Sequence, residues 1–305
     1  MGRKVEFGIS LQSAIDPIAF ARDAEELGYS YVFCGEHLFF HGPTMNAFMT
    51  LAAAAGVTRS VGLVSAVTLL PLYPPAIAAK LASSLDVLSQ GRFNLGVGIG
   101  GEYPPEFEAA GVAVGERAKR TDDALEVIDR LMRGDVVDFH SSFSSIPGLK
   151  LEPGPLQTPR VPFWIAGRRE RALVRVATFA DVWLPYMVAP QHVSDGIATL
   201  GSIAKESGTG GWAGRTAVHL FTAIDSDGSA AREMATRTMG QNYQQDMQRA
   251  ASRYFLAGTP AECVARLEEY VAAGMDVAML RLACPRGRAP EMARLIAEEV
   301  MPAFG

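Results

Sequence analysis

One stretch, residues 61–102, contains a complete strand, helix and second strand, and each boundary is marked in the sequence. Residues 61–67 form a short, branched apolar run that is typical of a buried parallel strand, and prolines from position 71 onward stop its continuation. The helix that follows carries apolar residues every three or four positions and ends at Gly91. A second buried strand, residues 93–99, then opens into glycines. Two parallel strands joined by a helix predict an α/β fold.

The same alternation continues along the chain. Helix starts are marked by Asp16-Pro17 and by the capping box that Thr259 forms with Glu262. Residues 135–160 predict an excursion with at most a short hairpin, and residues 225–253 predict additional helix. The strands are expected at residues 5–11, 31–35, 61–67, 93–99, 161–166, 181–184, 216–224 and 277–282. Eight strands alternating with helices predict a (β/α)8 TIM barrel, one domain over residues 1–305 with insertions after strands four and seven.

A doubly wound nucleotide-binding sheet is the main alternative fold. Residues 96–101 satisfy GxGxxG, but in a nucleotide fold this motif follows the first strand and opens a helix at once. Here it follows a fourth strand, and Pro104 and Pro105 intervene before the next helix. The barrel is therefore preferred.

Charge and composition limit the partners. The chain of 305 residues has a net charge of -5 and no Lys/Arg tract, so nucleic acid is not an expected partner. No apolar run reaches membrane-spanning length, and residues 1–4 lead into a strand without a signal-type apolar core, so we expect a cytoplasmic protein. The three cysteines are interpreted as reduced packing residues. The histidines lack clear metal-ligand spacing, although His37 and His41 lie four apart, and no metal site is expected.

In a (β/α)8 barrel the active site lies at the carboxyl ends of the strands. From the residues alone, a single histidine after a strand is more often structural than catalytic, and Ser65-Ala66-Val67 is better explained as a strand end. Gly98, Gly100 and Gly101 fit tight turning and close backbone approach to a cofactor equally well. The strand ends nominate Gln12, Glu36, His37, residues 65–68, residues 98–103, residues 167–169 and Tyr186.

The segment Leu88-Ser89-Gln90-Gly91-Arg92, followed by Leu95-Gly96-Val97-Gly98-Ile99-Gly100, resembles the signature of the bacterial-luciferase-like flavin and deazaflavin oxidoreductases. The resemblance extends over residues 7–302 and is weakest between about 201 and 257. It implies a (β/α)8 barrel that acts on a small organic substrate, and it implies a homodimer.

The resemblance also assigns roles to residues of strands two and three. Glu36-His37 matches an acidic-His pair whose imidazole faces the reactive side of the cofactor ring, which implies proton transfer or charge stabilisation by His37. Glu36 is placed at the cofactor, with orientation of the loop as the alternative. Ser65, Ala66 and Val67 would support one face of the ring, with a non-prolyl cis peptide at Ser65–Ala66 or at Ala66–Val67.

Further along the chain, the resemblance implies that Glu102 donates a proton, with Tyr103 as the substitute candidate. Gly167, Arg168 and Arg169 resemble the turn that holds the cofactor's phosphate. The family turn has two glycines and a small polar residue, whereas this chain has two arginines. The added charge favours a cofactor with a phosphodiester or an acidic tail.

These features predict an oxidoreductase that uses coenzyme F420 to transfer hydride to or from an organic substrate. An FMN-dependent monooxygenase is the alternative, and a non-catalytic cofactor-binding barrel is a further one. Loops 39–46 and 185–192 are long and apolar enough to form a substrate pocket, which favours an enzyme.

Overall fold

The computed structural model describes residues 4–208 and 211–305, so the expectation for the first three residues falls outside it. The chain divides into two compact units, which are described separately. Unit one comprises Met1–Phe33 and Ile165–Gly305, and unit two comprises Cys34–Trp164.

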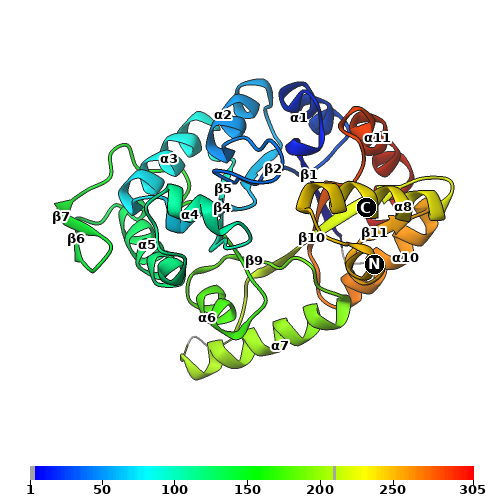
Figure 1. The fold of residues 1–305 in the computed structure, drawn as a ribbon. Helices are drawn as coiled ribbons and strands as arrows, with labels where there is room; N and C mark the ends of the chain where they lie inside the picture. Colours follow the sequence, from blue (N-terminus) through cyan, green and yellow to red (C-terminus); the bar gives the residue numbers. More distant parts are fainter. Residues whose placement is uncertain (1–3, 209–210) are drawn as a thin grey trace. The chain divides into compact units, whose positions relative to one another are not determined.

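Unit one is built on parallel strands in the order β9, β10, β12, β1, β2 (Figure 1). Ile9 of β1 pairs with Val32 on one side and with Leu280 on the other, and all three side chains are fully buried. The strands are β1 (Glu6–Ser10), β2 (Tyr31–Cys34), β9 (Val182–Leu184), β10 (Arg215–Ile224), β11 (Leu256–Gly258) and β12 (Val277–Leu282).

The helices of unit one begin where the sequence predicts caps. Asp16 Oδ1 accepts hydrogen bonds from the amides of Ile18 and Ala19, each at 3.0 Å. Thr259 and Glu262 form a capping box that starts α10. The helices are α1 (Pro17–Glu26), α6 (Glu170–Phe179), α7 (Pro190–Glu206), α8 (Gly228–Tyr243), α9 (Gln248–Tyr254), α10 (Pro260–Ala272) and α11 (Ala289–Glu299).

Unit two contains the strand–helix–strand element of residues 61–102. Strands β3 (Gly62–Ser65) and β4 (Thr68–Leu69) both pair in parallel with β5 (Phe93–Gly98). Strand β8 (Phe163–Ala166) begins at the end of this unit. The helices are α2 (Ala47–Val57), α3 (Pro75–Leu88), α4 (Pro104–Ala109) and α5 (Arg117–Met132).

Two glycines let β5 approach the preceding strand. A Cβ atom on Gly96 would lie 1.6 Å from the carbonyl oxygen of Ser65, and one on Gly98 would lie 2.4 Å from Val67 Cγ2. The Ser65 hydroxyl accepts a hydrogen bond from the Gly96 amide at 2.9 Å and donates to its carbonyl at 3.1 Å. Any larger side chain at either position would push the two strands apart.

All eight predicted strands are present, and so are both predicted insertions. After β5, the chain adds α4 before α5, and then a hairpin of β6 (Val137–His140) and β7 (Ser145–Leu149). After β10, the chain adds α8, α9 and β11 before α10, and α8 and α10 both pack against β11 (Figure 1). The three cysteines are buried thiols, as predicted. Among the described residues, no helix combines the length and the apolarity needed to cross a bilayer.

Candidate active site

The polar pair at the end of β2 contains a histidine held by a buried carboxylate. His37 Nδ1 lies 3.1 Å from Glu106 Oε1 and 3.2 Å from Oε2. Glu106 is 0 % exposed and also accepts the Leu38 amide at 3.0 Å, whereas the His37 side chain is 18 % exposed. Because a carboxylate accepts hydrogen bonds, the Glu106 contact favours the tautomer with the proton on Nδ1 and leaves Nε2 as the nitrogen that Glu106 does not contact.

Glu106 was missed by the sequence analysis, which placed the proton donor at Glu102. The Glu102 side chain is exposed, whereas Glu106 is buried in the first turn of α4. A partial signal was present: Pro104 and Pro105 are typical of a first helical turn, which places Glu106 at the start of a helix. Glu102 remains a prediction, but the carboxylate that contacts His37 is Glu106.

A cluster of aromatic rings lies on one side of the His37 imidazole. His37 stacks on Phe40 with centroids 4.1 Å apart and an interplanar angle of 15°. Tyr103 meets the rings of Phe40 and His41 edge-on, at 6.1 Å and 5.2 Å. Together with the carboxylate, the stacking ring fixes the orientation of the His37 imidazole.

Glu36 is a buried carboxylate that organises the loop after β2. Its Oε1 accepts the Leu69 amide at 3.1 Å, and its Oε2 accepts the Ala47 amide at 3.3 Å and the Tyr73 hydroxyl at 3.0 Å. Burial raises the pKa of Glu36, and these hydrogen bonds oppose the rise. Protein donors therefore occupy both oxygens, which supports the orienting role over direct cofactor binding.

The end of strand three has the backbone feature that the resemblance implied. A non-prolyl cis peptide joins Ala66 to Val67, which is the second of the two predicted positions. Ser65 is fully buried and bonded to Gly96, whereas Ala66 and Val67 are half-buried. The surface available at this strand end is therefore that of Ala66 and Val67.

The glycines after β5 are accounted for by the protein's own packing. Gly100 and Gly101 both have positive φ, at 58° and 112°. A Cβ atom on Gly100 would lie 2.9 Å from Phe107 Cζ, and one on Gly101 would lie 2.9 Å from Arg117 Nε. The backbone turns tightly at Gly100 and Gly101, whereas Gly98 is the last residue of β5, and close approach of a cofactor at these glycines stays a prediction.

The predicted phosphate turn lies at the start of α6. Gly167 has φ 130° and packs so closely that a Cβ atom would lie 2.4 Å from Ala172 Cβ. Arg168 donates to the carbonyl oxygens of Tyr186, at 3.3 Å, and of Met187. Arg169 is exposed at the N-cap, where no side chain caps the helix. Arg168 therefore braces the loop after β9, and both Arg168 and Arg169 are exposed.

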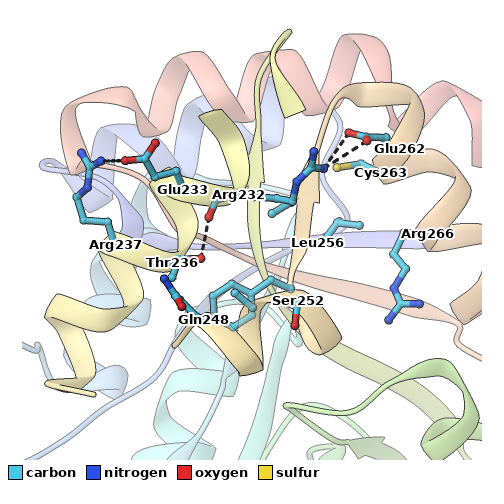
Figure 2. A pocket seen from close by; sticks show the side chains of 13 residues that line it. Arg232, Glu233, Thr236, Arg237, Gln248, Ser252, Leu256, Glu262, Cys263 and Arg266 are labelled. Carbon is cyan, nitrogen blue, oxygen red and sulfur yellow. Dashed lines mark hydrogen bonds and ion pairs between the residues drawn. The ribbon is translucent and has the colours of Figure 1, made fainter. Parts of the chain in front are cut away.

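A separate cavity of about 800 Å³ lies among α8, α9, β11 and α10 (Figure 2). Three arginines line it, and each faces a glutamate: Arg232 pairs with Glu262, Arg237 with Glu233 and Arg266 with Glu269. The buried Phe255, Leu256 and Cys263 also line it. Because its charges are already compensated, this cavity is not the candidate active site.

Solved structures establish the fold class. The monooxygenase RslO1 from Streptomyces bottropensis superposes with a TM-score of 0.85 at 24% identity, covering 99% of this chain and 100% of that chain. An F420-dependent secondary alcohol dehydrogenase, solved in complex with an F420-acetone adduct, gives 0.84 at 19% identity over 100% of both chains. The chain has the (β/α)8 barrel fold of these enzymes, as predicted.

Sequence relatives define the family. The uncharacterized protein Rv0940c of Mycobacterium tuberculosis is 34% identical over 202 residues, which is 66% of this chain and 68% of the relative. The pyrimidine monooxygenase RutA of Allorhizobium ampelinum is 28% identical over 184 residues, 55% of this chain and 49% of RutA. The family model described as luciferase-like monooxygenase matches residues 8–277. The chain belongs to the luciferase-like monooxygenase family and is an oxidoreductase of this family.

Proposed function

We propose that this protein is a coenzyme F420-dependent oxidoreductase that transfers hydride between the deazaflavin and a small organic substrate. The contact between His37 and Glu106 carries the proposal, because it orients an imidazole whose other nitrogen, Nε2, can exchange a proton with a substrate. Structural similarity to an F420-dependent alcohol dehydrogenase and to an F420-dependent reductase of Methanopyrus kandleri supports the choice of cofactor.

Each unit, taken by itself, has residues whose chemistry suits such a cofactor. In unit two, the half-buried Ala66 and Val67 offer small, flat surface for a ring, and the buried Thr68 Oγ1 beside them has no partner among the described residues. In unit one, the uncapped start of α6 carries Arg169 and Arg171, both exposed. Free helix amides and cations are the donors that phosphate and acidic tails require.

The protein's own contribution is proton management. The bound deazaflavin supplies the hydride chemistry. When hydride leaves or joins a substrate carbon, a proton must leave or join the neighbouring heteroatom. His37 Nε2 takes or gives that proton, while the Nδ1–H group donates its hydrogen bond to the Glu106 carboxylate and keeps the ring oriented.

An FMN-dependent monooxygenase is the second candidate. The description of the matching family and the sequence similarity to RutA favour it. In that case His37 and Glu106 would manage protons during oxygen chemistry, and the same residues would line the site.

Titration of the purified protein with F420 and with FMN, followed by fluorescence quenching, decides between the two. We expect F420 to bind at micromolar concentration or below, a free energy of about -8 kcal/mol. Tighter binding of FMN would replace the primary proposal with the second. If neither F420 nor FMN bound, the proposed function would be wrong, and so would the alternative of a non-catalytic cofactor-binding barrel.

A further inference from the structure

Unit one contains a cationic side chain, Arg281, that has no carboxylate partner among the described residues. Arg281 lies next to the last residue of β12, and Phe221 of the neighbouring β10 is paired with it in register. His219 lies two residues before Phe221 on the same strand. In a (β/α)8 barrel, the carboxyl ends of the strands are where substrates bind.

The surroundings of Arg281 are aromatic. Its Nη1 donates to the Tyr243 hydroxyl at 3.3 Å, and its guanidinium lies 5.7 Å from the Phe221 ring and 5.8 Å from the Tyr243 ring. The side chain is half-buried, and within residues 4–208 and 211–305 no carboxylate reaches ion-pair distance of it. Cation–π contacts compensate only part of the lost hydration of such a charge.

The arginines of the nearby helices differ from Arg281 in this respect. Arg232 of α8 lies 3.2 Å from the Glu262 carboxylate, and Arg237 pairs with Glu233 one helical turn away (Figure 2). A half-buried guanidinium that lacks such a partner can donate its remaining N–H groups to a bound ligand.

His219 adds an uncharged polar atom beside the cation. Its ring meets Phe221 edge-on at 5.4 Å and Phe33 at 5.6 Å, and its buried Nδ1 has no hydrogen-bond partner among the described residues. Burial, with a smaller contribution from the Arg281 charge, lowers the pKa of His219 to about 3. The imidazole is therefore neutral at physiological pH, and Arg281 is the charge of the cluster.

We propose that Arg281 binds a carboxylate or phosphate group of the substrate, with His219 as a neutral hydrogen-bonding neighbour and with Phe221 and Tyr243 against the substrate's apolar part. The ligand would supply the counter-charge that no described residue supplies, through the paired donors that a guanidinium offers to either anion. The assignment of the anion to the substrate rests on the proposed function, because a phosphate group of the cofactor would offer Arg281 the same chemistry.

Benzoate and benzamide test the proposal, because they share shape and differ in charge. Their binding to the purified protein is measured by calorimetry, for the wild type, Arg281→Met, Arg281→Lys and the control Arg237→Met. We expect benzoate to bind at millimolar concentration, about tenfold more weakly to Arg281→Met, and unchanged to Arg237→Met. Arg281→Lys keeps the charge without the planar fork, so its affinity should fall between those of the wild type and Arg281→Met. Benzamide should bind weakly to all four proteins.

Repetition with protein saturated by its cofactor separates the two sources of the anion. Unchanged benzoate affinity supports the substrate, whereas competitive displacement assigns Arg281 to the cofactor and overturns the proposal. Absence of benzoate binding, or equal affinity in Arg281→Met with unchanged thermal stability, also overturns it. Cofactor affinity is measured in the same variants, because it tests the proposed function independently. Loss of benzoate binding with unchanged cofactor affinity in Arg281→Met would support this inference whether or not the proposed function holds.

Discussion

His37 Nδ1 and Glu106 Oε1 lie 3.1 Å apart although 69 positions separate the two residues. The contact joins the loop after β2 to the first turn of α4. The contact fixes the orientation of the imidazole, since the carboxylate determines which ring nitrogen carries the proton.

The His37 side chain is expected to be required for turnover and dispensable for folding. We expect His37→Asn to keep its thermal stability and most of its cofactor affinity while kcat falls about 100-fold or more. Steady-state kinetics with an identified substrate, together with a cofactor titration, check this. Wild-type kcat in the variant would make His37 a structural residue.

The role of Glu106 is separable from that of Glu102 by matched amide substitutions. Glu106→Gln keeps the shape of the buried side chain but removes the negative charge that stabilises the imidazolium, so we expect kcat to fall at least about tenfold. Glu102→Gln, at an exposed position, should leave kcat within about twofold. The reverse pattern, with Glu102→Gln impaired and Glu106→Gln active, would restore the proton donor that the sequence analysis chose.

Glu36 is expected to make stability depend on pH. Burial raises its folded-state pKa above the ordinary 4.5, so the native state holds its proton to higher pH than the unfolded chain does. The stability that Glu36 contributes is therefore full below pH 4.5 and is lost as pH rises through the raised value. Urea unfolding at stepped pH should show wild type losing stability relative to Glu36→Gln across this window. If the stability of wild type relative to Glu36→Gln stayed constant or rose with pH, the assignment would be contradicted.

Close packing at Gly96 predicts a severe effect of a single methyl group. A Cβ atom there would lie 1.6 Å from the Ser65 carbonyl oxygen, which belongs to a paired strand and cannot move aside. We expect Gly96→Ala to destabilise the protein by more than about 3 kcal/mol or to prevent folding.

Gly56 of α2 provides the matched control for Gly96. A Cβ atom there would meet nothing within 4 Å, so we expect Gly56→Ala to be neutral or to stabilise by about 0.5–1 kcal/mol. Denaturant unfolding of both variants measures the contrast. Comparable stability of the two variants would show that β5 can shift away from Ser65.

The cations before α6 are expected to contribute unequally to cofactor binding. We expect Arg169→Ala to weaken cofactor affinity and to flatten its salt dependence with little change in melting temperature, because exposed charges add little to stability. Arg168→Ala should instead loosen the loop at Tyr186 and Met187, whose carbonyls it holds. Titrations at two ionic strengths test this. If the variant with both Arg168→Ala and Arg169→Ala bound the cofactor with an unchanged dissociation constant, the two arginines would be solvated surface residues without a role in binding.

The local patterns determined the elements and their ends. Apolar runs bounded by Pro71 and Gly91, and caps such as Asp16, depend on residues within one turn or strand, so the eight strands and both insertions were predictable. His37 was nominated in the same way, since a residue directly after a strand lies at its carboxyl end whatever the rest of the chain does.

Only the tertiary structure decided which side chains meet. The partner of His37 depends on how the turn after β5 brings α4 back, and the space at Gly96 and Gly98 depends on the register of β5 against Ser65 and Val67. The position of Arg281 beside Phe221 likewise follows from the register between β10 and β12. Such contacts span tens of residues, and a shift of one residue in strand register reverses which side chains face inward, so no local pattern encodes them.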